Sequence, residues 1–157
     1  MKLWVKVLVC VLLVNLIGGA GAIFTSSSIP TWYADLEKPP GVPPNWVFGP
    51  VWTTLYAMIG ISVALFWHRV APSPAKTRGW TIFSIQMILN FTWSPVFFGL
   101  HQIGWGLVII VALLVTLVIT IIAFRCQDKI AGRLLIPYGI WVGYATYLNA
   151  GYWALNG

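Results

Sequence analysis

The chain has 157 residues, of which 59% are hydrophobic and 8% are charged, and it carries a formal net charge of +6 at pH 7. An ordinary soluble domain contains about 25% charged residues. This chain has too few polar residues to cover a soluble surface, which excludes a soluble globular protein, a disordered chain and a nucleic-acid-binding domain. Its mean hydropathy of +0.86 predicts an integral membrane protein instead.

Five stretches of the chain are long and apolar enough to cross a membrane as helices. The hydrocarbon core of a bilayer is about 30 Å thick, so each crossing needs about 20 residues of helix. In chain order, we expect spanning helices over residues 4–24, 46–67, 80–100, 104–124 and 134–155. Most of the connections are short, so residues 1–157 are expected to form one domain, an all-α bundle of five transmembrane helices.

The basic residues predict how this bundle is oriented. When alternate connections are given to alternate sides, eight of the nine basic residues fall on one side and only Lys38 falls on the other. Basic loops face the cytoplasm, so the N-terminus is expected inside and the C-terminus outside. Long apolar helices favour the bacterial inner membrane as the location.

The first predicted helix has two interpretations. Lys2 and Lys6 precede an apolar run that ends near Ala20 and Ala22, a pattern also typical of a cleavable signal peptide. The run is long for a signal peptide, whose apolar core has about 7–15 residues. Gly18 and Ala22 also form a pair of small residues suited to close helix packing. The residues alone leave both interpretations open.

The longest connection, residues 25–45, is unusual because it contains five prolines between Pro30 and Pro44. These prolines prevent a continuous helix. The aromatic Trp32 and Tyr33 indicate that the connection folds onto the helix ends. It is either a lid over a cavity, as long loops in compact domains often are, or an interfacial segment held in the lipid headgroups by its aromatic side chains.

Ten tryptophans are many for a chain of this length. Seven lie near predicted membrane boundaries, where an aromatic belt explains them: Trp4, Trp32, Trp46, Trp67, Trp80, Trp105 and Trp153. Trp52, Trp93 and Trp141 lie further inside the predicted helices, and each has aromatic or amide neighbours at helical spacing. Each of these tryptophans and its neighbours form a stripe along one helix. If the three stripes converge, they form an aromatic pocket suited to a large, flat, mostly apolar ligand. Ordinary helix packing is the alternative.

Few polar residues lie within the predicted spans. Gln86 and Asn90 are four residues apart on one helix and serve either as hydrogen bonds between helices or as ligand contacts. No charged residue lies mid-span, which argues against a proton-coupled pump. His68 and His101 fall on opposite membrane faces, about 30 Å apart, so they cannot bind one haem iron. No familiar catalytic or metal-binding spacing occurs, so no catalytic residue and no metal ligand is assigned.

Three ordered motifs make the chain resemble one membrane protein family. They are WYADLEKP at residues 32–39 with Pro43-Pro44 after it, NFTWSPVFFG at residues 90–99, and PYGIW at residues 137–141 with ATYLN at residues 145–149. The motifs and the five predicted helices resemble the TspO/MBR family, also called tryptophan-rich sensory protein, translocator protein or peripheral-type benzodiazepine receptor. The family keeps its first helix, which favours retention here.

The resemblance implies a five-helix bundle, commonly a homodimer, with a pocket covered by the first loop. Family members bind porphyrins such as protoporphyrin IX, benzodiazepine-type and isoquinoline drugs, and in some cases cholesterol. No cofactor is required, and protoporphyrin IX or a haem-like tetrapyrrole is the implied ligand. By motif position, the implied ligand-binding residues are Tyr33, Trp52, Asn90, Trp93, Trp141 and Ala145. Trp52 and Trp141 would stack on the ligand.

The expected function is therefore that of a membrane receptor, sensor or transporter for porphyrin-type and other flat apolar ligands. Two alternatives stay open: an enzyme that degrades porphyrin in light, and a structural or regulatory membrane partner without a dedicated ligand.

The chain departs from the family pattern at two places. Gly41 replaces a tryptophan of the loop, which makes a lid more flexible. No basic residue follows Arg133, so the C-terminal sterol motif is absent and cholesterol recognition is not expected.

Overall fold

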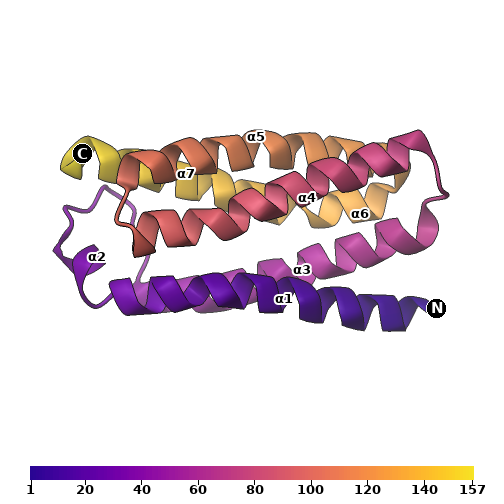
Figure 1. Cartoon of the computed structure of the whole chain (residues 1–157), viewed down its shortest axis with the longest axis horizontal. Helices are drawn as coiled ribbons and strands as arrows, with labels where there is room; N and C mark the ends of the chain where they lie inside the picture. The colour runs from indigo at the N-terminus through magenta and orange to yellow at the C-terminus, as the bar shows by residue number, and fades with distance from the viewer.

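The computed structural model describes residues 1–157 and contains helices, turns and loops but no strands. The five long helices are α1 (Leu3–Ser28), α3 (Phe48–Arg69), α4 (Pro74–Ser94), α5 (Ile103–Gln127) and α7 (Ile136–Asn156), arranged side by side in Figure 1. The shorter elements are α2 (Trp32–Asp35), the 3-10 turn η1 (Asn45–Val47), the π-helical turn η2 (Pro95–Gly99) and α6 (Lys129–Leu134). The all-α class expected from the sequence is confirmed.

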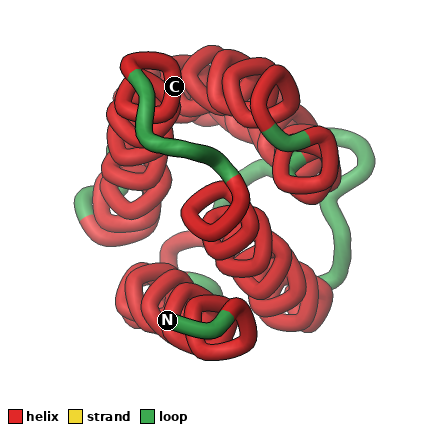
Figure 2. The backbone as a smooth tube through the Cα atoms, turned by 90° about the vertical axis from the view of Figure 1, so that its right-hand side faces the viewer, coloured by secondary structure: helices red, strands yellow, loops and turns green.

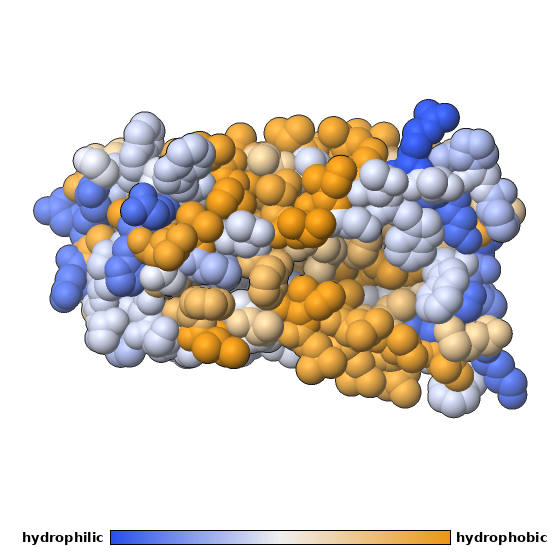
Figure 3. All heavy atoms as spheres, viewed as in Figure 1, coloured by the Kyte–Doolittle hydropathy of each residue, from blue (hydrophilic) through white to orange (hydrophobic).

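Four helical segments are long and apolar enough to cross a membrane: Leu3–Ser28, Asn45–Arg69, Pro74–Gly99 and Ile103–Gln127. Helix α7 has 21 residues but is less apolar than these four. Its polar Tyr138, Asn149 and Tyr152 are buried inside the protein rather than exposed. Figure 3 shows an apolar band across the middle of one face of the molecule, with hydrophilic residues at both ends. The chain is an integral membrane protein.

The observed helices differ from the predicted spans mainly at their ends. Helix α1 continues to Ser28 instead of ending at residue 24, and α4 begins at Pro74 instead of residue 80. The hydroxyl of Ser73 accepts a hydrogen bond from the Lys76 backbone N–H at 3.1 Å, and Pro74 occupies the first turn. This is an N-cap followed by a proline that needs no backbone donor. The predicted spans placed residues 68–79 in a connection, so this helix start was not predicted.

The helices form two groups. Helix α1 lies along α3, and α4, α5 and α7 lie together on the other side, as the end view in Figure 2 shows. Close approach of α1 and α3 depends on Gly60, where a Cβ atom would lie 2.5 Å from the Cα of Val11. Small residues allow such contacts between membrane helices. The hydroxyl of Ser62 also donates to the Ala131 carbonyl at 2.7 Å, which ties α3 to α6.

The two ends of the bundle differ in charge and in how they are filled. The N-terminus, the α3–α4 connection and α6 lie at one end, which we call the basic end because it carries every basic residue except Lys38. A tightly packed core fills this half, and the rings of Phe66 and Phe124 stack there at 3.8 Å. The opposite half, beneath the long loop between α1 and α3, is called the loop end. Its buried side chains are largely aromatic.

Candidate ligand-binding cavity

A cavity of about 310 Å³ lies in the loop end. Helices α1, α3, α4 and α7 form its walls, and the long loop contributes Ile29 and Tyr33. Five of the six residues implied for the ligand site line this cavity: Tyr33, Trp52, Trp93, Trp141 and Ala145. The chain therefore brings residues from four separate segments to one place.

Small residues of α1 leave room on one side of the cavity. Gly18, Gly19 and Ala22 all line it and recur on one face of the helix. A Cβ atom at Gly18 would overlap the ring of Tyr56, whereas a Cβ atom at Gly19 would meet nothing within 4 Å. Gly18 is thus required for the position of Tyr56, and Gly19 borders open space.

Aromatic rings form the other walls. The rings of Trp52 and Tyr56 stack with centroids 5.2 Å apart and an interplanar angle of 27°. Trp141 meets Phe48 edge to face at 6.2 Å, and both side chains line the cavity. Walls of indole and phenol rings present flat apolar surface at little cost in side-chain entropy, which suits a flat, mostly apolar molecule.

Asn90 is the implied site residue that does not line the cavity. The Tyr56 hydroxyl donates to the Asn90 side-chain oxygen at 3.2 Å, and the Asn90 amide donates to the Tyr138 hydroxyl at 2.8 Å. Tyr138 in turn donates to the side-chain oxygen of Gln86 at 3.0 Å. Gln86 is fully buried, and its Nε2 has no partner. Gln86 and Asn90 therefore form hydrogen bonds between helices, and Asn90 supports the cavity wall from behind Tyr56.

A second hydrogen-bonded pair fixes Trp93. Its indole N–H donates to the Asn149 side-chain oxygen at 3.1 Å, and the Asn149 amide donates to the Ile103 carbonyl at 3.0 Å. The polar edge of the indole is therefore satisfied within the protein. The ring also stacks on Phe97 of the π-helical turn η2, with centroids 5.2 Å apart. Trp93 is held by α5, α7 and η2 together.

Tyr33 connects the loop to the cavity. Its side chain is buried, and its hydroxyl accepts a hydrogen bond from the Tyr152 hydroxyl at 2.7 Å. Burial, followed by this hydrogen bond, raises the pKa of the Tyr33 phenol above its ordinary value. The phenol is therefore neutral at physiological pH, and Tyr33 adds no charge to the cavity that it lines.

Polar side chains at the end of α7 anchor the loop. The side-chain amide of Asn156 donates to the Glu37 carbonyl at 3.0 Å and accepts from the Glu37 backbone N–H at 2.9 Å. The Tyr147 hydroxyl donates to the Pro40 carbonyl at 3.1 Å. The sequence analysis did not assign Asn156 or Tyr147 to the site. The only available signal was the polar character of α7 near its C-terminus.

Gly41 is the position where the chain departs from the family loop. Its φ of +89° lies in the left-handed region, which glycine adopts without strain and a tryptophan does not. The Tyr144 hydroxyl donates to the Gly41 carbonyl. The loop backbone here is therefore suited to glycine, and it is fixed by a phenol of α7.

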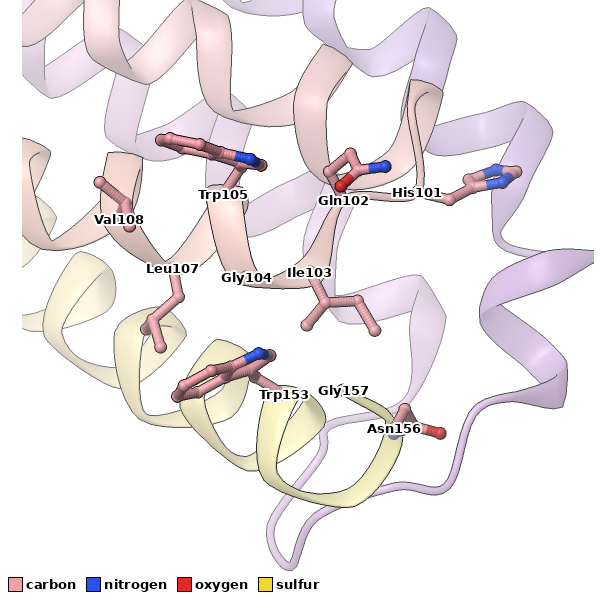
Figure 4. Close-up of a pocket in the computed structure, with 10 residues that line it drawn as sticks. All are labelled: His101, Gln102, Ile103, Gly104, Trp105, Leu107, Val108, Trp153, Asn156 and Gly157. Carbon is pink, nitrogen blue, oxygen red and sulfur yellow. The ribbon is translucent and has the colours of Figure 1, made fainter.

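A second hollow and a histidine lie at the loop end outside the cavity. A hollow of about 600 Å³ lies between the start of α5 and the end of α7, where Trp105 and Trp153 are both exposed (Figure 4). It contains none of the six implied site residues.

The two histidines lie apart. His101 borders this hollow and stacks on Trp32 at 4.3 Å, whereas His68 lies at the end of α3. No three His, Cys, Asp or Glu side chains come together as a metal site would require.

The fold and the cavity define a class of protein: an all-helical membrane protein with an aromatic cavity beneath a loop that is anchored to the last helix. Comparison with known families identifies the family within this class. Residues 10–154 match the model of the TspO/MBR family, so the chain belongs to the TspO/MBR family. The resemblance seen in the three sequence motifs is thereby confirmed.

Relatives from distant organisms match over most of the chain. A tryptophan-rich protein TspO of Archaeoglobus fulgidus is 42% identical over 151 residues, 96% of this chain and 97% of that protein. The human translocator protein is 38% identical over 126 residues, 80% of this chain and 75% of that protein. A tryptophan-rich sensory protein of Cereibacter sphaeroides is 35% identical over 118 residues, 75% of this chain and 72% of that protein.

Proposed function

We propose that the protein is a membrane receptor, sensor or transporter that binds porphyrin-type and other flat apolar ligands in the cavity of the loop end. The observation that carries this proposal is the meeting of Tyr33, Trp52, Trp93, Trp141 and Ala145 at one cavity. The names of the relatives, translocator protein and tryptophan-rich sensory protein, fit transport or sensing. Protoporphyrin IX or a haem-like tetrapyrrole is the proposed ligand.

The long loop acts in this proposal as a lid. The cavity volume of about 310 Å³ is at the lower end of the range for drug-sized ligands, about 300–1,000 Å³, so a tetrapyrrole needs additional space. Displacement of Tyr33 provides it, because this side chain lies on the loop rather than on a long helix. The hydrogen bonds from Asn156 and Tyr147 then hold the lid shut in the absence of ligand.

All five long helices cross the membrane in this proposal, as one domain. Helix α7 is long enough to span, and its lower hydropathy follows from polar groups that face the protein interior. The basic end faces the cytoplasm of a bacterial inner membrane, which places the N-terminus inside and the C-terminus outside. An impermeant maleimide tests this orientation, because Cys126 is exposed at the basic end and Cys10 is buried. Labelling of Cys126 is expected in inverted vesicles and not in intact cells.

The ligand site is tested by titrating the purified protein in detergent with protoporphyrin IX in darkness, with tryptophan fluorescence as the readout. Trp141→Leu removes a cavity wall, and the matched control Trp153→Leu removes a tryptophan that borders the other hollow. We expect saturable quenching that Trp141→Leu weakens at least tenfold and Trp153→Leu leaves unchanged. Quenching that is linear in ligand and insensitive to both variants would mean that porphyrin partitions into detergent, and would contradict the proposal.

Illumination of the protein–porphyrin complex distinguishes a receptor or transporter from an enzyme that degrades the porphyrin. Trp52 and Trp141 would lie beside a light-absorbing ligand, and indole rings are readily oxidised. The mass of the bound porphyrin is therefore measured after illumination and after an equal time in darkness. A receptor or transporter leaves the ligand chemically intact, whereas a product that forms only in light and only with the intact Trp52 and Trp141 would establish a degrading enzyme. The homodimer implied by the family is tested separately by chemical cross-linking in the membrane.

A further inference from the structure

A hollow of about 400 Å³ at the basic end lies far from the aromatic cavity. It is lined by Ile122, Arg125, Cys126, Lys129 and Arg133, from the last turns of α5 and from α6. Arg125 and Cys126 lie three and four residues after Ile122 and share one stripe of α5 with it. Helix α6 brings Lys129 and Arg133 to the same hollow, so three basic side chains meet there.

The turn between α5 and α6 creates this arrangement. Asp128 caps α6 because its Oδ1 accepts hydrogen bonds from the backbone N–H groups of Ile130 and Ala131, both at 2.9 Å. Gly132 then lies directly against the backbone of Arg125, where a Cβ atom would overlap it. The close contact at Gly132 holds α6 against the end of α5, which keeps the backbone positions of the three basic residues close together.

The charges at the hollow are not neutralised within the protein. Asp128, the nearest acidic residue in sequence, pairs with Arg69 at 3.6 Å. The other two acidic residues, Asp35 and Glu37, lie at the loop end. Arg125, Lys129 and Arg133 make no ion pair, so the hollow carries three uncompensated positive charges.

Other basic residues at this end are engaged differently. The Lys6 ammonium lies over the Trp67 ring, 4.5 Å from its centroid. The Lys76 ammonium donates to the carbonyls of Trp67 and Val70. Lys2 and Arg78 are exposed outside this hollow, so Arg125, Lys129 and Arg133 are the basic side chains that meet there.

We propose that this hollow binds the phosphate headgroup of an anionic phospholipid such as phosphatidylglycerol. The stripe continues from the cations through Ile122, Ile119 and Val115, all exposed, toward the apolar belt. A molecule that is anionic at one end and apolar along its length matches this sequence of side chains, whereas a free phosphate uses only the cations. The site is separate from the proposed ligand cavity and does not depend on it.

The test compares two variants that remove equal charge from the basic end. Arg125→Gln with Lys129→Gln removes two cations from the hollow, and Lys2→Gln with Arg78→Gln removes two exposed cations outside it. Native mass spectrometry of the delipidated protein in detergent measures binding of phosphatidylglycerol, phosphatidylcholine and glycerol phosphate. Each basic residue near an anionic surface contributes about fivefold in binding, so the first double variant should lose roughly 30-fold in affinity for phosphatidylglycerol. The second double variant should change less than twofold.

Cys126 provides an independent readout that does not depend on detergent. It lines the hollow and is exposed, whereas Cys10 is buried. Phosphatidylglycerol in nanodiscs should slow alkylation of Cys126 by N-ethylmaleimide in the wild type and in the Lys2/Arg78 variant, and not in the Arg125/Lys129 variant. Equal loss of lipid in both double variants, or equal affinity for the two phospholipids, would overturn the proposal. Binding of glycerol phosphate as tightly as the lipid would also overturn it and indicate a site for free phosphate.

Discussion

The half of the bundle at the basic end (the basic half) and the half at the loop end (the loop half) both contain glycines and aromatic rings. These residues serve different purposes in the two halves. In the basic half, Gly60 lets α1 and α3 touch, and the rings of Phe66 and Phe124 stack with no space between them. In the loop half, small residues of α1 such as Gly19 face large rings of α3 and α7 across a cavity. Gly60 thus allows two helix backbones to touch, whereas Gly19 borders open space.

The two halves also differ in what holds them together. Contacts in the basic half are mostly apolar and continuous, whereas contacts in the loop half rely on hydrogen bonds between side chains far apart in sequence, such as Trp93 with Asn149. Within lipid, helix association depends on close van der Waals contact and on hydrogen bonds between helices. Hydrogen bonds between side chains therefore hold the helices of the loop half in place around the cavity, as a preformed binding site requires.

The largest effect is expected from truncation of the core in the basic half. Phe66 is fully buried and contacts Phe124 and Trp80, so Phe66→Ala leaves a large void. Such substitutions cost about 3–5 kcal/mol, and we expect about 3 kcal/mol because lipid is as apolar as the core. Thermal unfolding in detergent measures the loss. A melting temperature unchanged from wild type would show that the basic half is not the stable part of the bundle.

A matched pair of glycine substitutions sharpens the comparison. Gly60→Leu forces a side chain into the backbone at Val11 and is expected to destabilise the protein by about 1–3 kcal/mol or more. Gly19→Leu extends into the cavity and should change stability by less than about 1 kcal/mol, while weakening protoporphyrin IX binding at least tenfold. Melting temperature and fluorescence titration of both variants test the pair. Equal effects of the two variants on stability would contradict the difference between the halves.

The two buried amides are expected to differ in how much their removal costs. Gln86→Met removes the unpaired Nε2, whose burial costs about 1–3 kcal/mol, but it also leaves the buried Tyr138 hydroxyl without its acceptor, which costs a similar amount, so stability should change little. Asn90→Leu leaves Tyr56 without its acceptor and Tyr138 without its donor, and should cost about 2 kcal/mol. Melting temperatures of the two variants are compared directly. A larger loss for Gln86→Met than for Asn90→Leu would show that Gln86 has a partner in the membrane.

The smallest effect on stability is expected at the anchored loop. Tyr147→Phe removes the hydrogen bond to the Pro40 carbonyl, about 0.5–1.5 kcal/mol, and leaves the ring in place. Because this bond joins the loop to α7, the loss should appear as faster hydrogen exchange in residues 36–44 with little change in melting temperature. Thr146→Val, which removes a hydroxyl that donates to the Val142 carbonyl within the same helix, serves as the control. Exchange that is equally fast in both variants would show that Tyr147 does not anchor the loop.

Features that depend on residues close together in the chain were predicted from the sequence better than features that depend on residues far apart in the chain. Apolar runs and helical spacing predicted the long helices, and motifs predicted which rings meet at the cavity, because these depend on local periodicity or on family pattern. The loop anchors were missed because Asn156 and Glu37 are far apart in the chain and neither stands out alone. The residues alone left open whether Asn90 bonds other helices or a ligand, since spacing places a residue on a helix face without stating which partner its amide takes. Gly41 was interpreted as flexibility, but it adopts a defined left-handed turn.

We propose that the cavity of the loop end holds a flat apolar ligand between the walls formed by Trp52 and Trp141. An experimental structure of the protein with protoporphyrin IX, obtained in darkness, tests this claim most directly. We expect ligand density in contact with both indole rings and a displaced Tyr33, with α1 and α3 unchanged in the basic half. Density in the hollow between Trp105 and Trp153, or ligand confined to the surrounding detergent, would contradict it.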